Sequence, residues 1–460
     1  MISQDTIERI LDAADIAQIV GQFVFKETKV QVVFSLKKQG ANLFACCPFH
    51  SEKSPSFAVF PKSGTFKCFG CGEQGNSVSF LMKHERLSYP EALRWIAKQY
   101  NIEIEEEEVS PQKQLEQRQK EAMWIANEYL AKEYAKALFS DAGSVARNYA
   151  LKRWSKQYCE EIGIGYCPEG SKIAKNGYIS EEIIESLHLC NKAGFDFFSG
   201  RITIPIRDRQ QHIIGFTSRI IGDGKPKYMN SSDSLIYNKS KSIFGIDVAW
   251  REAARTERFY LVEGAPDCMR LHIIGVYNAV APLGTSWTEA HFNTLRRVAS
   301  HLCFIPDADV VKEGERFGAG TKAVIKSGEL ALKMGFTVSV RQIPIVNVKQ
   351  DPDTYCKSIQ IFNSLEEKDF ITWYSDIHIH EGMTTDEKSK VVNKLATLLS
   401  YVEDEVTITL HINNLTKLGY NRSFWKKTIE KQRREASEQE AKEKSEKEQE
   451  IYKRFGFNIE

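Results

Sequence analysis

Cys47-Pro48-Phe49-His50 and Cys68-Phe69-Gly70-Cys71 are the two stretches that decide the fold of the first part of this chain. Each stretch contains two ligand-type side chains with two residues between them, and seventeen residues separate the two pairs. Three thiolates and one imidazole at this spacing are typical of a closed tetrahedral zinc site. Gly70 and Gly72 lie in the second turn, where glycine lets backbone amides point at sulfur. We therefore expect one structural Zn²⁺, rather than buried free thiols, and its ligands are Cys47, His50, Cys68 and Cys71.

The composition is that of a globular protein with several domains. The chain has 460 residues, of which 42% are hydrophobic and 11% aromatic. No apolar run approaches the roughly 20 residues that span a bilayer, and Met1 to Val20 reads as an amphipathic helix, unlike a signal peptide. The six cysteines after Cys71 are scattered without a disulfide framework, as in a reducing compartment. We expect a cytoplasmic protein without a membrane segment.

Positive charge is unevenly distributed along the chain. The formal net charge is only +1, but Asp196 to Ser242 contains eight Lys or Arg against four Asp. Local patches, and not the total charge, determine whether a surface attracts nucleic acid. This region is therefore a candidate nucleic-acid surface.

Alternating strands and helices are expected from Arg258 onward, which predicts a mostly parallel sheet. The expected strands are Phe259–Val262, Val276–Ala281, Leu302–Ile305 and Thr337–Ile343, and the expected helices are Met269–Ile274, Thr288–Ala299 and Lys322–Met334. Acids follow three of these strands, namely Glu263, then Asp307 and Asp309, then Asp351 and Asp353. Because the carboxyl ends of parallel strands meet at one edge, these acids should converge there. A group of carboxylates with no histidine among them suits Mg²⁺ or Mn²⁺. Two such ions can support the transfer of a phosphoryl or nucleotidyl group.

The sequence around the zinc ligands resembles the zinc ribbon of bacterial DnaG-type primases. The resemblance rests on Leu36 to Asn42, Cys47 to Phe57 and Cys71 to Asn76, and it continues through Phe80 to Met82 and Leu87 to Ala92. One departure is the segment Glu27 to Phe34, which lengthens the strand or hairpin before the Lys-Lys-Gln-Gly turn.

A second resemblance is to the primase form of the TOPRIM domain and to the basic half of the same polymerase core. The resemblance to the TOPRIM domain rests on Leu261 to Asp267, Ala281 to Ser286 and Asp307 to Asp309. The resemblance to the basic half rests on Gly200 to Asp208, Gly215 to Arg219 and Pro226 to Ser231. By this resemblance Glu263, Asp307 and Asp309 would hold catalytic magnesium, with support from Asp267, Asp351 and Asp353. The residues that it implies for template or triphosphate are Arg153, Arg201, Arg219, Lys227, Asn230 and Lys239.

The chain departs from the family pattern close to these acids. Ala308 replaces the usual glycine between the two aspartates, and Val310 to Phe317 is inserted before Gly318-Ala319-Gly320. Because alanine is less free in φ than glycine, Ala308 puts the position of Asp309 in question.

The expected fold is a multidomain α/β and α+β chain with six segments. They are a zinc-ribbon DNA-binding domain (1–102), a linker (103–113), a mixed α+β basic part of the polymerase core (114–256), a TOPRIM catalytic domain (257–358), a helical region (359–428) and a charged tail (429–460). Helices are expected at Ser364–Tyr374, Thr385–Val402 and Glu405–Leu415, although Val406 to Thr409 is a β-branched run.

The resemblance implies a DNA primase that makes short RNA primers on single-stranded DNA by metal-dependent nucleotidyl transfer. Its expected partners are the single-stranded template, ribonucleoside triphosphates and a replicative helicase that the carboxyl-terminal helices would contact. We expect a monomer. In the ribbon, basic and aromatic side chains would engage template bases by stacking, and the candidates are Lys37, Lys38, Phe57, Phe66 and Phe69, with Phe57 better explained as core. Two alternatives are a TOPRIM strand-cleaving enzyme of topoisomerase or nuclease type and a non-catalytic single-strand-binding module.

Overall fold

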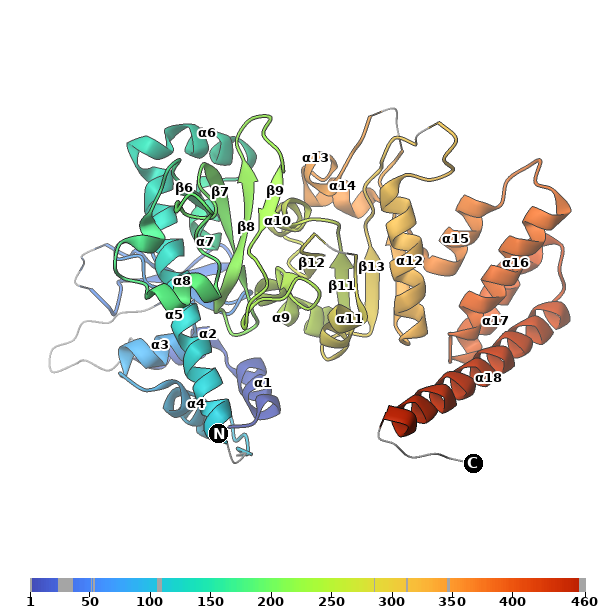
Figure 1. Cartoon of the computed structure of the whole chain (residues 1–460), viewed down its shortest axis with the longest axis horizontal. Coiled ribbons are helices and arrows are strands. Elements are labelled where there is room, and N and C mark those ends of the chain that lie inside the picture. Colours follow the sequence, from blue (N-terminus) through green and yellow to red (C-terminus); the bar gives the residue numbers. More distant parts are fainter. Residues whose placement is uncertain are drawn as a thin grey trace. The chain divides into compact units, whose positions relative to one another are not determined.

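The computed structural model describes residues 2–23, 36–50, 52, 54–105, 110–284, 286–311, 313–345 and 348–454 (Figure 1). Two compact units are present, one made of residues 1–257 with 264–285 and the other of residues 258–263 with 286–460. The predicted hairpin extension from Glu27 to Phe34 lies outside the described residues.

The first unit begins with a small antiparallel sheet flanked by helices in sequence. The helices are α1 (Gln4–Ala13), α2 (Ile16–Phe23), α3 (Ser77–His84) and α4 (Tyr89–Gln99). The strands are β1 (Lys37–Gln39), β2 (Asn42–Ala45), β3 (Phe57–Phe60), β4 (Thr65–Cys68) and β5 (Gln74–Asn76), and each pairs with the next. We call residues 2–105 the ribbon.

The ribbon has a hydrophobic core of its own. Phe57 and Phe66 stack with ring centroids 5.1 Å apart, and Phe80 meets Phe66 edge-on at 5.7 Å. Phe57 and Phe80 are fully buried, and Phe66 is only 1% exposed. The placement of Phe57 in the core is confirmed, whereas the prediction that Phe66 engages template bases is wrong, because its ring fills the space between two core aromatics. Phe69 remains 40% exposed.

The next element is a long helix, α5 (Pro111–Phe139), which packs against a second antiparallel sheet. That sheet has the order β6 (Gly165–Cys167), β7 (Arg201–Arg207), β8 (Ile213–Ile220) and β9 (Tyr228–Asn230). Gly165 allows β6 to approach α5 closely, since a Cβ there would lie 2.6 Å from the Tyr134 carbonyl carbon. The other helices of this part are α6 (Ser144–Arg153), α7 (Lys156–Ile162), α8 (Glu181–Ser186) and α9 (Ile246–Thr256).

Residues 264–285 also belong to the first unit. They form α10 (Ala265–Ile273) and β12 (Ala279–Pro282), and β12 pairs antiparallel with β10 (Ile243–Phe244). Both predicted elements in this segment are thus confirmed, with shifted bounds.

The second unit contains the parallel strands expected from the alternating pattern. β11 (Arg258–Leu261), β13 (His301–Phe304) and β14 (Thr337–Arg341) run parallel and in register. Helices α11 (Glu289–Arg296) and α12 (Ala319–Lys333) follow in sequence as predicted. The carboxyl ends of β11, β13 and β14 therefore lie at the same edge of the sheet. The predicted metal-binding acids come after these ends in the sequence.

A fourth strand, β15 (Glu367–Asp369), pairs antiparallel with β14. The helix expected over Ser364–Tyr374 is wrong in its first half, because α15 begins only at Phe370 and ends at His378. The reason is Glu367, whose carboxylate lies 3.0 Å from Arg258 Nη1 and 3.0 Å from Arg341 Nε and so holds this segment against the sheet.

The remaining helices are α13 (Pro352–Tyr355), α14 (Ile359–Ser364), α16 (Thr385–Ser400), α17 (Glu405–Leu415) and α18 (Arg422–Arg454). The β-branched run in α17 is helical because Ile408, Ile412 and Leu415 form one buried face and Asp404 caps the first turn. Within the described residues, no helix is long and apolar enough to cross a membrane.

Candidate metal centres

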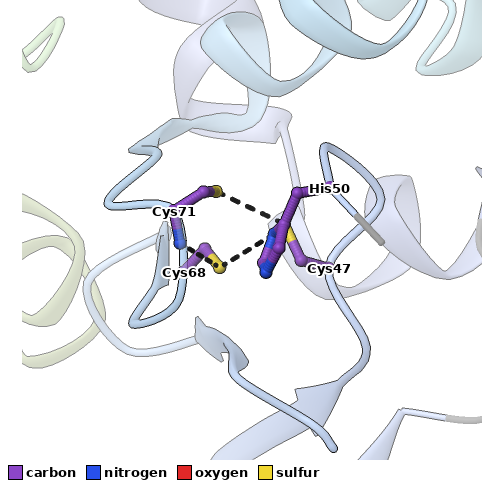
Figure 2. Close-up of side chains that lie close together, drawn as sticks. All are labelled: Cys47, His50, Cys68 and Cys71. Atoms are coloured by element: carbon purple, nitrogen blue, oxygen red, sulfur yellow. Dashed lines mark hydrogen bonds between the residues drawn. The ribbon is translucent and has the colours of Figure 1, made fainter. Parts of the chain in front are cut away.

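The four predicted zinc ligands come together at the ends of ribbon strands (Figure 2). Their ligand atoms all lie within 4.8 Å of one another, with Cys47 Sγ 3.8 Å from Cys71 Sγ and Cys68 Sγ 3.7 Å from His50 Nδ1. A tetrahedron with Zn–S bonds of about 2.3 Å has edges of about 3.8 Å, so the quartet has the dimensions that zinc requires. Cys46 is not part of it.

Backbone amides point at the quartet sulfurs, as the glycines in the second turn predict. The amides of Gly70 and Cys71 lie 3.3 and 3.4 Å from Cys68 Sγ. Gly72 has a φ of +79°, whereas Gly70 is required for a different reason, since a Cβ there would lie 2.7 Å from His50 Nε2. Burial alone would raise the pKa of Cys68, but the Ser56 hydroxyl and these amides outweigh it and lower the pKa.

Glu52 is a residue of this centre whose role the sequence did not reveal. Its Oε2 lies 3.3 Å from His50 Nε2, and its Oε1 accepts the Cys47 amide at 2.6 Å and the Ser56 amide at 3.1 Å. The carboxylate therefore orients the imidazole with Nδ1 toward the sulfurs and also ties together the loop that carries Cys47. A metal-bound histidine usually has its second ring nitrogen hydrogen-bonded to a carboxylate or a carbonyl in this way.

A second group of candidate ligands lies in the second unit, beyond the carboxyl ends of β11 and β13. We call Glu263, Asp307 and Asp309 the acidic rim. Glu263 Oε1 accepts the Asp307 amide at 3.1 Å, so two of the predicted acids meet across neighbouring parallel strands. Asp307 is 7% exposed, and its Oδ1 is buried with no hydrogen-bond partner. A buried carboxylate oxygen without a donor is what a missing cation would satisfy, so the rim fits a divalent metal.

The carboxylates of the rim have different electrostatic surroundings. Burial, and then the charge of Asp307, raise the pKa of Glu263 to about 7. Burial also raises the pKa of Asp307. Burial would raise the pKa of Asp309 too, but Lys349 and the amides of Gly320 and Ala319 outweigh it, so the pKa is lowered.

Lys349 is the charged residue of this centre that the sequence did not reveal. Its Nζ lies 2.9 Å from Asp307 Oδ2 and 2.7 Å from Asp309 Oδ1. A backbone bridge between Ala308 and Gln350, with N···O distances of 2.8 and 3.1 Å, places Lys349 beside the rim. Its only signal in the sequence is that it comes two residues before Asp351.

Ala308 does not displace Asp309. Its φ is not in the left-handed region, and its side chain is fully buried. Asp309 Oδ2 accepts the Gly320 amide at 2.8 Å, so this acid caps the first turn of α12 after the inserted segment. Gly320 itself has to be glycine, because a Cβ there would contact Glu263 Oε1 and lie 2.7 Å from the Asp307 carbonyl oxygen.

The three predicted supporting acids lie in two short stretches of helix, and a local role is clear for one of them. Asp351 caps α13, with its Oδ1 2.8 Å from the Thr354 amide, and its charge also raises the pKa of Asp307. Asp353 is 4% exposed within α13. Asp267 lies in the first turn of α10 in the first unit and is 7% exposed.

Two of the predicted basic residues belong to one cluster in the first unit. Arg219 on β8 has its Cζ 5.0 Å from the Tyr149 ring centroid and 5.1 Å from that of Tyr228, and Arg153 Nη1 donates to the Tyr149 hydroxyl at 2.9 Å. The two tyrosines were not predicted, because Tyr149 and Tyr228 come together only when α6 packs near β8 and β9.

The other four predicted basic or polar residues differ in exposure. Arg201 is 6% exposed, and its Nη2 donates to the Pro226 carbonyl at 2.9 Å. Asn230 Nδ2 donates to the Leu283 carbonyl at 3.0 Å. Lys227 is exposed, and Lys239 is half-buried, with its amide 3.0 Å from Asp233 Oδ1.

Three family models match the chain in succession. The CHC2 zinc finger of DnaG matches residues 2–112, the amino-terminal domain of the DNA primase catalytic core matches 133–250, and a Toprim-like model matches 260–356. These matches fit a structural zinc in the ribbon and a divalent metal at the acidic rim.

Relatives and solved structures of primases cover most of this chain. A DNA primase of Clostridium acetobutylicum is 32% identical over 365 residues, which are 78% of this chain and 57% of that protein. A DNA primase of Chlamydia muridarum is 30% identical over 436 residues, which are 90% of this chain and 68% of that protein. The chain thus spans only part of the length of these relatives.

The zinc-binding and RNA polymerase domains of the Aquifex aeolicus primase are 25% identical with a TM-score of 0.60, covering 90% of this chain and 96% of that structure. A DnaG primase catalytic domain solved with single-stranded DNA has the same fold, with 24% identity and a TM-score of 0.54 over 65% of this chain and 99% of that structure. From the ribbon to the rim, the chain belongs to the DnaG-type DNA primase family.

Proposed function

We propose that this chain is a DNA primase, which makes short RNA primers on single-stranded DNA from ribonucleoside triphosphates. The observation that carries the proposal is the acidic rim, in which the buried Asp307 carboxylate meets Glu263 across parallel strands and has one oxygen without a partner. A nucleotidyltransferase needs such a cation-binding group where a triphosphate can be placed.

In this proposal Glu263 and Asp307 hold one ion, and Asp307 and Asp309 hold another, with Mg²⁺ or Mn²⁺ as the ion. Bound ions would polarise the attacking hydroxyl and neutralise charge on the leaving pyrophosphate. Backbone amides of the chain would position the acids that bind the ions. The amide of Gly320 at the start of α12 fixes Asp309, and the Asp307 amide fixes Glu263.

The proposed template face is the cluster of Arg153, Arg219, Tyr149 and Tyr228, together with the exposed Lys227. Guanidinium groups stacked on aromatic rings suit an unpaired strand, because they can contact phosphates and bases without reading a sequence. In the ribbon, the exposed Lys37, Lys38 and Phe69 are the remaining candidates for template contacts. Arg201 would act indirectly by holding the backbone beside Lys227. A helicase that docks on α15 to α18 stays a prediction.

The test is primer synthesis on single-stranded DNA with four ribonucleotides and Mg²⁺ or Mn²⁺. The wild-type chain should make short RNA, and Asp307→Asn should make none, because it removes the negative charge of the shared ligand, while single-strand affinity stays within threefold. Asp386→Asn is the matched control, since Asp386 is an exposed acid in the first turn of α16 and is not one of the rim acids.

Other outcomes would favour the alternatives. Metal-dependent cutting of the DNA by the wild-type chain would indicate a strand-cleaving TOPRIM enzyme. Binding without any synthesis, with either metal, would indicate a non-catalytic module. Ala308, the departure beside the two aspartates, does not favour the second alternative, because its backbone φ is not in the left-handed region.

A further inference from the structure

Lys349 gives the acidic rim a positive charge of its own. The ammonium group bridges Asp307 Oδ2 and Asp309 Oδ1 at 2.9 and 2.7 Å. A divalent ion shared by these two aspartates would compete with the ammonium group for Asp309 Oδ1, because Asp309 Oδ2 already accepts the Gly320 amide. Two cations cannot occupy this position together, because they would repel each other at close range.

The position of Lys349 is built into the backbone. The amide of Ala308 donates to the Gln350 carbonyl at 2.8 Å, and the amide of Gln350 donates back at 3.1 Å. This pair of hydrogen bonds joins the residue between the two aspartates to the residue after the lysine. The side chain of Lys349 is 55% exposed, whereas those of Asp307 and Asp309 are 9% and 14% exposed, so the lysine covers acids that are otherwise enclosed.

The two proposed metal positions of the rim differ in which carboxylate oxygens are free to bind an ion. Asp307 Oδ1 has no partner, and it lies on the acid that meets Glu263. Asp309, in contrast, has Oδ1 engaged by Lys349 and Oδ2 engaged by the Gly320 amide. Among the described residues, the zinc quartet is the group in which three or more ligand atoms lie within 4.8 Å of one another. The three acids of the rim are therefore not all close enough to hold one ion together. A first ion can therefore bind at Glu263 and Asp307, but a second ion at Asp309 must displace the ammonium group.

We propose that Lys349 is an internal counter-ion that occupies the second cation position of the rim and weakens metal binding there until it is displaced. The proposal rests on the proposed function, which makes the rim a metal centre. It predicts two unequal affinities in the wild-type chain, the weaker of which depends on the charge of residue 349.

The test is a Mn²⁺ titration of the zinc-loaded full chain, with free Mn²⁺ followed by electron paramagnetic resonance, so that no catalysis is required. Lys349→Met keeps the length of the side chain and removes the charge. It should tighten the weaker Mn²⁺ site at least tenfold and change the tighter site by less than threefold. Lys322→Met is the matched control, because Lys322 pairs with Glu315 at 2.7 Å and its side chain is 51% exposed. It should behave like the wild-type chain.

The inference would be overturned if the Mn²⁺ affinities of Lys349→Met stayed within twofold of those of the wild-type chain, or were weaker. It would also be overturned if neither protein bound Mn²⁺. Asp307→Asn identifies which bound Mn²⁺ belongs to the rim. The two proposals can fail separately. Mn²⁺ that is lost in Asp307→Asn but unaffected by Lys349→Met contradicts the role of Lys349 alone, whereas a wild-type chain that binds Mn²⁺ but makes no primer contradicts the proposed function alone.

Discussion

Asp307 and Asp309 are two residues apart, yet their carboxylates have opposite surroundings. Asp307 is enclosed beside Glu263, and burial raises its pKa. Asp309 accepts the Gly320 amide and the Lys349 ammonium group, and its pKa is lowered. Asp309 thus combines a proposed metal role with the capping of α12. A useful substitution has to remove its charge and keep the cap, which asparagine does.

We predict that Asp309→Asn lowers the rate of nucleotide addition at least a hundredfold, or about 2.7 kcal/mol by transition-state arithmetic, because the second ion loses a negatively charged ligand. The midpoint of thermal unfolding should move by only a few degrees, since the Gly320 amide keeps an acceptor. Single-turnover primer extension measures the rate, and calorimetry measures the midpoint. A rate within threefold of wild type would mean that the centre works without Asp309.

Glu52 is the corresponding residue at the zinc quartet. We predict that Glu52→Gln weakens zinc binding roughly 10- to 100-fold, because a hydrogen-bonded carboxylate that orients a metal-bound histidine is replaced by a neutral amide. Competition with a coloured zinc chelator measures the affinity.

Glu85→Gln is the matched control for Glu52→Gln, since Glu85 pairs with His84 Nδ1 at 2.9 Å in the same ribbon, and neither residue is part of the quartet. Equal zinc affinities in the two variants would contradict the orienting role of Glu52.

At the scale of elements, the ribbon sheet depends on zinc because its strands are only three or four residues long. We predict that Cys68→Ser loses zinc and unfolds mainly residues 2–105, since structural zinc supplies much of the stability of a small domain. Hydrogen exchange should show lost amide protection in β2 to β4 and retained protection in α5 and β7. Cys46→Ser is the control, because Cys46 lies outside the quartet. Loss of protection in both regions alike would contradict the prediction.

Elements and sites that depend on local patterns could be predicted from the sequence. The zinc quartet follows from two short turns, and the pairing of Glu263 with Asp307 follows from parallel strands that end at one edge. Lys349 could not be predicted, because its place depends on a backbone bridge between residues 42 positions apart, Ala308 and Gln350. The strand at Glu367–Asp369 was missed for the same kind of reason, since its partners Arg258 and Arg341 are distant in the sequence.

At the scale of the whole molecule, the net charge of +1 conceals a separation of charge along the chain. The exposed lysines near β9 and the guanidinium groups of Arg153 and Arg219 belong to the first unit, whereas acidic and basic side chains nearly balance over the rest of the chain outside Asp196 to Ser242. Affinity for a single strand should therefore depend strongly on salt despite the near-neutral total, because phosphate contacts release counterions locally.

Lys227 offers the sharpest test of this view. It is exposed, and the residue before it is held by Arg201, whose Nη2 donates to the Pro226 carbonyl at 2.9 Å. If Lys227 contacts one template phosphate, Lys227→Ala should reduce the slope of log affinity against log salt by about 0.7, the value for one contact to a single strand. Fluorescence anisotropy with a labelled oligonucleotide at several salt concentrations measures the slope. Lys390→Ala, on the exposed side of α16, should leave the slope unchanged. A weaker affinity for Lys227→Ala with an unchanged slope would instead place this lysine against a base or the protein itself, because only a lost phosphate contact changes the number of counterions released.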